Sequence, residues 1–285
     1  MRPFIIRPSL FVAALIACLQ LLSCASVITT PRTQSGQAIE DFGFIAIQSD
    51  APIQAYLKIR TAKIRPVGIE SELTIYIEGD GAHWLFQMAP PPNPTPPKSL
   101  VVSLATQDQG PFTLYLARPC QYIDIAQFKD CEPSLWTEGR FSPVVIQYAN
   151  DVIDKVLLDL PKVRINLVGH SGGGTLATLL AAKRSDVGCL VTLASPLDIA
   201  AWTRSLALGP LHLSKNPADP NIRLANIRQT HFFGENDSIV KKESIGNYRN
   251  FSDKTDFIVI SGFDHTKAWA KEWPMLQKKS CLALD

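Results

Sequence analysis

Short runs of apolar residues alternate with longer amphipathic segments through most of the 285-residue chain. Apolar runs bounded by turn residues predict strands, whereas apolar residues at helical spacing predict helices. Strands are expected at 42–50, 53–60, 72–81, 112–119, 164–170, 188–196, 229–237 and 255–262, with a further strand-like run at 99–107. Helices are expected at 142–161, 173–185, 238–250 and 266–279. This order predicts an α/β fold with a mostly parallel central sheet and helices on both faces.

Two segments interrupt the alternation. Residues 89–99 are rich in proline and predict either a rigid surface loop or a rim of a functional site. Residues 196–225 break the alternation of strands and helices, and they are long enough to form a short lid-like insertion over the sheet, though not a separate domain. The large apolar residues of this insertion suit either an acyl-binding lid or ordinary packing. They are Trp202, Leu206, Leu208, Leu211 and Leu213.

Composition and charge exclude several classes of function. The chain is 46% hydrophobic and 19% charged, with a formal net charge of +2, so we expect no nucleic-acid partner. It contains neither a phosphate-binding P-loop motif nor a Cys-x-x-Cys or His-x-x-x-His spacing. We therefore expect no bound metal and no zinc site.

The N-terminal segment has the layout of a secretory signal peptide. Arg2 and Arg7 precede an apolar stretch that reaches the small residue Ser23. The tetrad Leu-Leu-Ser-Cys at 21–24 resembles the lipobox of bacterial lipoproteins. This resemblance implies that Cys24 becomes a lipid-bearing N-terminus that anchors the protein to a membrane.

Two alternatives stay open for this segment. A second lipobox-like tetrad ends at Cys18, and the apolar stretch is compatible with a transmembrane anchor, although Gln20 argues against one. Ala25 after Cys24 is not an inner-membrane retention signal of the Asp type, so the resemblance favours the outer membrane, on its periplasmic or surface side. The predicted division is a signal peptide at 1–23, a lipidated cysteine and tether at 24–39, and an α/β domain at 40–285.

The remaining four cysteines form an even set, which in an exported protein suggests disulfides. Cys120 and Cys131 are close in sequence and flank loop-like residues, so we expect them to pair. Cys189 lies within an apolar run, where a buried free thiol and a bridge to Cys281 are both reasonable.

The sequence Gly169-His-Ser171-Gly-Gly173 follows a predicted strand and opens a predicted helix. In this context the G-x-S-x-G pattern places a serine on a strained turn with its hydroxyl exposed. Gly169 and Gly173 are expected to remove Cβ atoms that collide as the helix folds back. The alternative is a nucleotide-binding turn, but the segment does not match G-x-G-x-x-G in register.

A serine nucleophile needs a base, and in this arrangement an acid and then a histidine follow it in the chain. His265 stands in the loop after the last predicted strand, where such sheets place their chemistry, so it is the predicted base. His231 lies inside a predicted strand and His212 inside the insertion, so both are weaker candidates.

The predicted acid is Asp237, which ends the loop after the preceding strand. Glu235 competes with it, whereas Asp264 is badly placed to bond the ring of its neighbour His265. Taken alone, Asp237 is equally suited to cap a helix that begins near Ser238.

Acyl transfer also requires main-chain N–H groups that stabilise an oxyanion. One is expected from Gly172, directly after the nucleophile, and the other from the loop after the third strand. Asp80 is the candidate in that loop, with Gly81 as the alternative and a plain Gly-Asp-Gly turn as the competing interpretation.

Together, the motifs at 169–173, 234–237 and 262–265 resemble the α/β-hydrolase superfamily. "EGDG", "LARPCQY", "SLWTEGRFS" and "ASPLD" are similar to a bacterial group of exported predicted α/β hydrolases, many of them lipoproteins. The resemblance implies a cofactor-free serine hydrolase that cleaves a carboxylic ester or thioester through an acyl-enzyme. It also implies a small-molecule or lipid acyl substrate. A peptidase or amidase on the same fold and a non-catalytic binding lipoprotein are the alternatives.

Overall fold

The computed structural model describes residues 39–64, 71–81, 90–224, 226–248 and 254–283. The contacts within the chain define a compact unit at Thr33–Asp285. The predicted signal peptide, both lipobox cysteines and nearly all of the predicted tether lie outside the described residues. Among the residues that are described, no helix is both long enough and apolar enough to cross a membrane.

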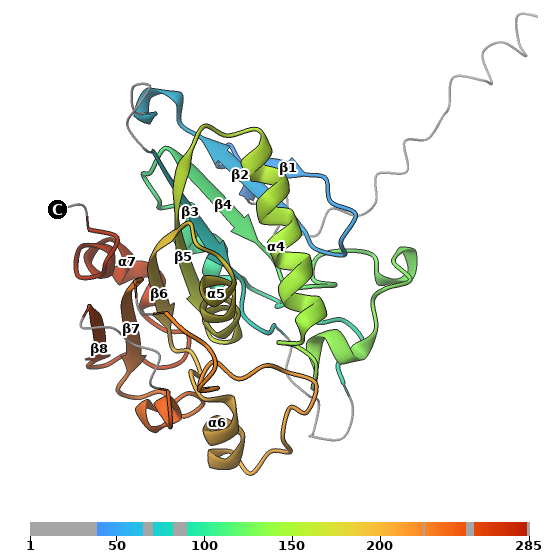
Figure 1. The fold of residues 1–285 in the computed structure, drawn as a ribbon, viewed down its shortest axis with the longest axis vertical. Helices are drawn as coiled ribbons and strands as arrows, with labels where there is room; N and C mark the ends of the chain where they lie inside the picture. Colours follow the sequence, from blue (N-terminus) through green and yellow to red (C-terminus); the bar gives the residue numbers. More distant parts are fainter. Residues whose placement is uncertain (1–38, 65–70, 82–89, 225, 249–253, 284–285) are drawn as a thin grey trace, which may run out of the picture. The chain divides into compact units, whose positions relative to one another are not determined.

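An eight-stranded sheet forms the centre of this unit (Figure 1). The strand order is β1-β2-β4-β3-β5-β6-β7-β8; β2 pairs antiparallel with β1 and β4, and all other pairs are parallel. The strands are β1 Ile45–Ile47, β2 Ala55–Ile59, β3 Ser71–Ile77, β4 Phe112–Leu116, β5 Val163–His170, β6 Val187–Leu193, β7 Arg228–Gly234 and β8 Thr255–Ile260. The helices are α3 Leu100–Ala105, α4 Pro143–Leu158, α5 Gly172–Lys183, α6 Ile199–Ser205 and α7 Trp269–Lys278, with 3-10 turns η1 Thr61–Lys63, η2 Ile125–Gln127, η3 Pro133–Trp136 and η4 Lys242–Ile245.

Helices cover both faces of the sheet, as the sequence predicts. On one face, α4 and α5 pack against side chains such as Leu73 and Ile75 of β3. On the other face, α3 and α7 pack against Tyr76 of the same strand and Val168 of β5. Alternate residues of a strand point to opposite faces, so two separate apolar cores form across one sheet.

The strand-like run at 99–107 is a helix, which corrects the sequence-based prediction. The Ser99 hydroxyl accepts a hydrogen bond from the Val102 N–H at 2.9 Å and so caps the first turn of α3. This cap supplies a partner for a main-chain donor that the helix leaves free. The β-branched residues Val101 and Val102 favour a strand locally, but their burial against the sheet is compatible with a short helix.

The predicted helix at 238–250 is also wrong over its described part. The one helical element there is η4, a single 3-10 turn, and Gly246, whose φ is +50°, follows it. The Asp237 carboxylate accepts hydrogen bonds from the N–H groups of Ile239 and Val240, both at 2.8 Å. These bonds hold the start of the segment in a turn.

α7 tolerates the proline that the sequence places inside it. Pro274 has no N–H, so the Ala270 carbonyl one turn earlier loses its helical partner. The Gln107 side chain, just beyond α3, donates to this carbonyl at 2.9 Å. A side chain from the segment that follows α3 therefore takes the place of the missing helical donor.

Two disulfides link the four cysteines. Cys120 pairs with Cys131, as predicted, and Cys189 of β6 pairs with Cys281 after α7. The second pair resolves the choice that the sequence leaves open in favour of a bridge. Two bridges indicate that the protein resides in an oxidising compartment outside the cytoplasm.

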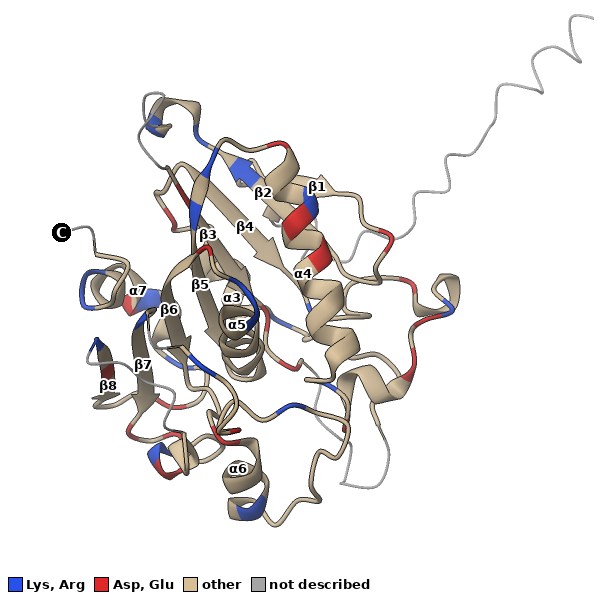
Figure 2. Cartoon of the chain, viewed as in Figure 1, with Lys and Arg blue, Asp and Glu red and all other residues tan. Residues whose placement is uncertain are grey.

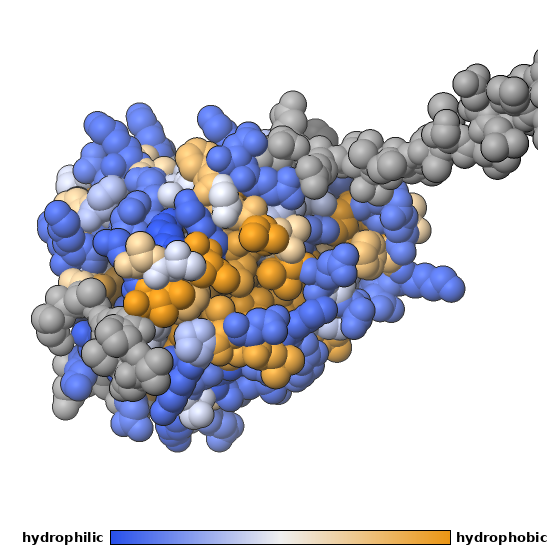
Figure 3. Space-filling view, turned by 90° about the horizontal axis from the view of Figure 1, so that it is seen from above, coloured by the Kyte–Doolittle hydropathy of each residue, from blue (hydrophilic) through white to orange (hydrophobic). Residues whose placement is uncertain are grey.

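Charged residues lie mostly on loops and on the outer sides of helices, whereas the strands carry few (Figure 2). In a view turned by 90°, apolar side chains gather in the middle of one face and hydrophilic ones surround them (Figure 3). The buried charged residues are therefore exceptions that require partners. They include Glu78, Arg118, Arg140 and Asp237.

The two bridges differ in the length of chain that they close, and this difference predicts their effects. Cys189 and Cys281 are 92 residues apart, and Cys120 and Cys131 are 11 apart. From loop-closure entropy alone, removing the Cys189–Cys281 bridge should lower the free energy of unfolding by about 4.6 kcal/mol, and removing the Cys120–Cys131 bridge should lower it by about 2.8 kcal/mol. Denaturant unfolding of C189A/C281A and of C120A/C131A measures both. An equal or smaller loss for the longer loop contradicts this expectation.

Candidate active site

Ser171 occupies the turn between β5 and α5 with φ +54°, a positive value that is rare for residues other than glycine. Glycines make the turn sterically feasible. A Cβ on Gly169 would lie 2.4 Å from the carbonyl of Gly173, and one on Gly173 would lie 2.2 Å from the Ile77 carbonyl oxygen. A Cβ on Gly174 would lie 2.0 Å from the Ser195 hydroxyl. The close approach of α5 to the sheet therefore requires all three glycines.

Three side chains from different loops form one hydrogen-bonded chain. His265 Nε2 lies 3.0 Å from Ser171 Oγ, and His265 Nδ1 lies 2.9 Å from Asp237 Oδ2. Ser171 follows β5, Asp237 follows β7 and His265 follows β8, so all three lie at the carboxyl edge of the sheet. Because the carboxylate accepts from Nδ1–H, Nε2 is left to accept the serine proton.

The two carboxylate oxygens of Asp237 have different partners. One carboxylate oxygen accepts from the main-chain N–H groups of Ile239 and Val240, and the other bonds His265. The Asp237 side chain is fully buried. Its orientation toward His265 is therefore fixed by the turn that follows it.

The competing acids lie elsewhere. Glu235 is exposed and accepts from the Ser261 hydroxyl at 2.6 Å. Asp264 accepts from the main-chain N–H groups of Thr266 and Lys267. Neither carboxylate bonds the His265 ring.

The competing histidines are also separate from Ser171. His212 is exposed in the insertion. His231 is fully buried in β7, with its ring nitrogens 2.8 Å from Thr192 Oγ1 and 3.2 Å from Gln229 Oε1. His231 is therefore a packed core histidine.

The sequence does not reveal the role of His170. Its Nε2–H donates to the His265 carbonyl at 2.7 Å, and the two rings lie 5.1 Å apart. Burial, followed by the positive charge of a protonated His265, lowers the pKa of His170 to about 4. A neutral His170 thus supports the loop that carries His265.

The two oxyanion candidates lie next to each other. The main-chain N–H groups of Gly172 and Asp80 have no hydrogen-bond acceptor within the described part of the chain. A Cβ built on Gly172 would lie 1.9 Å from Asp80 Oδ1. The Asp80 carboxylate binds Arg118 at 2.8 Å and Arg140 at 3.0 Å, contacts that local sequence patterns did not indicate.

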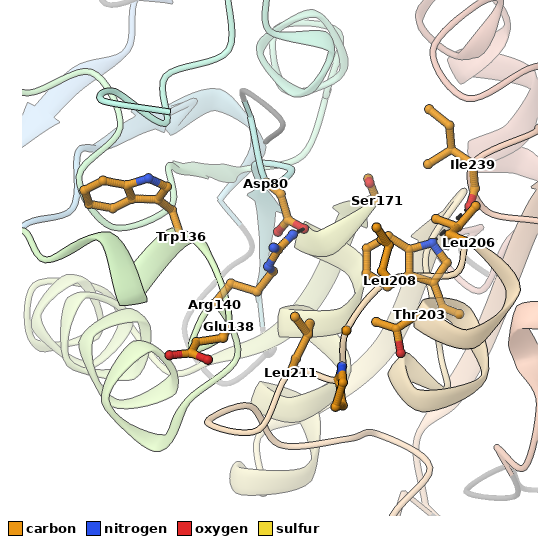
Figure 4. A pocket seen from close by; sticks show the side chains of 13 residues that line it. Asp80, Trp136, Glu138, Arg140, Ser171, Thr203, Leu206, Leu208, Leu211 and Ile239 are labelled. Atoms are coloured by element: carbon orange, nitrogen blue, oxygen red, sulfur yellow. Dashed lines mark hydrogen bonds and ion pairs between the residues drawn. The ribbon is translucent and has the colours of Figure 1, made fainter. Parts of the chain in front are cut away.

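A pocket of about 510 Å³ opens beside Ser171 (Figure 4). Asp80 and Arg140 form a polar part of its wall, and the insertion supplies much of the apolar part. Four of the five insertion residues noted in the sequence line it, namely Trp202, Leu206, Leu208 and Leu211. Leu213 is 51% exposed and is not part of the wall. Among the described residues, no group of three His, Cys, Asp or Glu side chains is arranged to hold a metal ion.

The architecture is the α/β-hydrolase fold. A family model described as "alpha/beta hydrolase fold" matches residues 132–233. An esterase of Pyrococcus furiosus superposes with a TM-score of 0.54 at 13% identity, covering 85% of this chain and 95% of its own. Est1E from Butyrivibrio proteoclasticus gives 0.53 at 15% identity, covering 83% and 96%. No curated protein matches the sequence significantly.

A third similar structure is an α/β serine hydrolase homologue from Coxiella burnetii. Its TM-score is 0.51 at 17% identity, with 85% of this chain and 97% of that chain covered. At sequence identities this low, the structural similarity establishes the fold alone.

Two of the buried histidines, His170 and His231, predict a loss of stability in acid. Burial lowers the pKa of His231 to about 3, and His170 titrates at about 4, whereas an unfolded histidine titrates near 6.5. As the pH falls below 6.5, the unfolded chain binds protons that the native chain does not. The free energy of unfolding should therefore fall by about 1.4 kcal/mol per pH unit for each histidine until its native pKa is reached.

Urea unfolding of wild type and H231Q between pH 7 and pH 4 measures this slope. Relative to its own value at pH 7, the free energy of unfolding of H231Q should fall less steeply with decreasing pH than that of wild type. H212Q, which alters an exposed histidine, should keep the wild-type slope. Parallel curves for wild type and H231Q would show that His231 does not contribute.

Proposed function

We propose that this protein is a serine hydrolase that cleaves carboxylic esters or thioesters through an acyl-enzyme. The observation that carries the proposal is the hydrogen-bonded chain from Ser171 through His265 to buried Asp237, beside an apolar pocket. The similar structures include a protein named as an esterase and one named as a serine hydrolase homologue, which is consistent with this function.

In the proposed reaction, Ser171 Oγ attacks the substrate carbonyl while its proton passes to His265 Nε2. Asp237 accepts from Nδ1–H, so it fixes the ring orientation and stabilises the imidazolium. The proton then passes to the leaving alcohol or thiol. Water then attacks the carbonyl carbon of the acyl-enzyme while His265 Nε2 takes its proton. The proton returns to Ser171 Oγ as the carboxylic acid is released.

The negative oxygen of the tetrahedral intermediate needs donors that are already in place. The main-chain N–H groups of Gly172 and Asp80 have no acceptor within the described part of the chain, and the two residues are in close contact, which supports the predicted oxyanion site. Each donor of this kind contributes about 2.7–4 kcal/mol to lowering the barrier in other enzymes.

The pocket supports an apolar acyl substrate. The side chains of Trp202, Leu206, Leu208 and Leu211 come from the insertion, which therefore acts as a wall of the acyl site. Burying an acyl chain there contributes about 0.8 kcal/mol for each methylene group. Est1E, which shares the fold, has been solved with ferulic acid bound.

Substitution of Ser171 tests the proposal. A fluorophosphonate probe should label wild type and S103A, which alters an exposed serine in α3, but not S171A. Hydrolysis of a p-nitrophenyl ester should fall by about 10³-fold or more in S171A and H265Q, and the matched p-nitroanilide should be cleaved more slowly than the ester by wild type. A folded wild-type protein that is neither labelled nor active refutes the enzymatic function.

We also propose that the protein is exported and lipid-anchored to the outer membrane through Cys24. The two disulfides support export, and the lipobox-like tetrad supports the anchor. In cells fed a labelled fatty acid, C24S should lose both lipid label and membrane fractionation, whereas C18S should keep both. Retention of label and membrane fractionation in C24S contradicts the assignment.

A further inference from the structure

The Asp80 side chain lies in an unusual place for a carboxylate. A Cβ on Gly172 would lie 1.9 Å from its Oδ1, 2.3 Å from its Cγ and 2.6 Å from its Oδ2, so the whole carboxylate is against the first residue of α5. Gly172 is also the residue whose N–H is proposed to stabilise the oxyanion. A negative side chain therefore lies next to the position where the proposed reaction creates negative charge.

An isolated carboxylate at this position would oppose the reaction. The Asp80 side chain is only 11% exposed, so little water is available to screen it. Like charges that are close together in a poorly solvated site repel strongly. The negative field of Asp80 must be cancelled if the oxyanion is to form there.

Two arginines cancel this field. Arg118 Nη1 lies 2.8 Å from Asp80 Oδ1, and Arg140 Nη1 lies 3.0 Å from Oδ2, so each guanidinium binds a different oxygen. Burial raises the pKa of Asp80, but the two guanidinium groups outweigh burial and lower the pKa below its usual value. The carboxylate is thus ionised and doubly paired.

The arginines are themselves held rigidly. Arg118 follows β4, donates through Nη2 to the Arg140 carbonyl and lies over the Phe141 ring at 5.2 Å. Arg140 donates through Nε to the Thr137 carbonyl at 2.5 Å. Their side chains are 4% and 11% exposed, so the three charged groups form a fixed unit that joins three separate segments.

The other nearby carboxylates do not take this place. Glu78 contributes negative charge near Arg118, but it accepts from the hydroxyls of Ser99 and Tyr115 and from the Gly79 N–H. Glu138 is exposed and points away from Asp80 (Figure 4). Of these carboxylates, Asp80 is the one against Gly172.

We propose that Arg118 and Arg140 are positioning residues for the acyl-transfer reaction. By binding the two oxygens of Asp80 they fix the loop that presents the Asp80 main-chain N–H, and they neutralise the charge that Asp80 brings to the oxyanion site. This inference rests on the proposed function and adds two residues to the machinery. Removing one arginine should expose part of the Asp80 charge, and removing that charge as well should reverse the effect.

Steady-state kinetics of single variants and of a compensating double variant with a p-nitrophenyl ester test the proposal. R140Q should lower kcat by about tenfold to a hundredfold with little change in KM, because the effect acts on the transition state. D80N/R140Q should recover most of the lost kcat, and R118Q should behave as R140Q does. R184Q removes an arginine that binds two other aspartates, Asp154 and Asp186, and should leave kcat unchanged.

Thermal unfolding of every variant separates misfolding from the electrostatic effect. If R140Q keeps full kcat, or if folded D80N/R140Q stays as slow as R140Q, the arginines do not act by neutralising Asp80 and the inference is wrong. A wild-type protein without activity or probe labelling defeats the proposed function, and this inference fails with it. If the probe labels wild type but D80N/R140Q does not recover kcat, this inference is wrong while the proposed function stands.

Discussion

The close approach of α5 to the carboxyl ends of β3 and β5 is the contact on which the rest of the site depends. Gly173 packs against the Ile77 carbonyl, and Gly169 packs against Gly173, at distances where no Cβ fits. The chain satisfies this packing by turning sharply at Ser171, where φ is +54°. The packing energy of the buried α5 helix stabilises a conformation that costs of order 1–3 kcal/mol on its own. As a result, the hydroxyl projects from the edge of the sheet toward the loops after β7 and β8.

Three buried histidines show how surroundings assign different roles to one residue type. His265 bonds a carboxylate on one side and a hydroxyl on the other, an arrangement that suits proton transfer. His231 has only neutral partners in a strand, and its lowered pKa keeps it uncharged. His170 donates to a main-chain carbonyl and supports the His265 loop. Residue type alone does not distinguish these roles, whereas the partners of each ring do.

Local sequence patterns predicted much of the fold because strands, glycine turns and strand-end loops depend mainly on nearby residues. The order of the loops along the chain also restricts the candidates to Ser171, Asp237 and His265, whose side chains are hydrogen-bonded in the structure. The run at 99–107 has a strand-like sequence because two adjacent valines favour a strand locally, while the Ser99 cap and burial against the sheet are compatible with a helix. The segment after Asp237 has a helix-like sequence, but its conformation depends on the carboxylate that also bonds His265.

Local sequence patterns do not indicate that Arg118 and Arg140 contact Asp80. They are 22 residues apart, and each is 38 or more residues from Asp80, so only the folded chain brings the three together. The pairing of Cys189 was undetermined for a similar reason, because an apolar run around a cysteine fits a free thiol and a bridge equally well. Interactions between distant, individually unremarkable residues are the part of a site that needs a structure.

The segment at 118–122 connects the Cys120–Cys131 disulfide to the loop that carries Asp80. Gln121 Nε2 donates to the Gly79 carbonyl at 3.0 Å and to the Pro94 carbonyl at 3.3 Å, and the Tyr122 N–H donates to Thr95 at 2.7 Å. The bridge from Cys120 closes directly beside these contacts. The described part of the proline-rich segment therefore shares hydrogen-bond partners with the Gly79–Gly81 loop and supports it. This role lies between the two that the sequence suggests, a surface loop and a rim of the site. An oxidising compartment, by allowing this bridge to form, stabilises the segment on which the position of that loop depends.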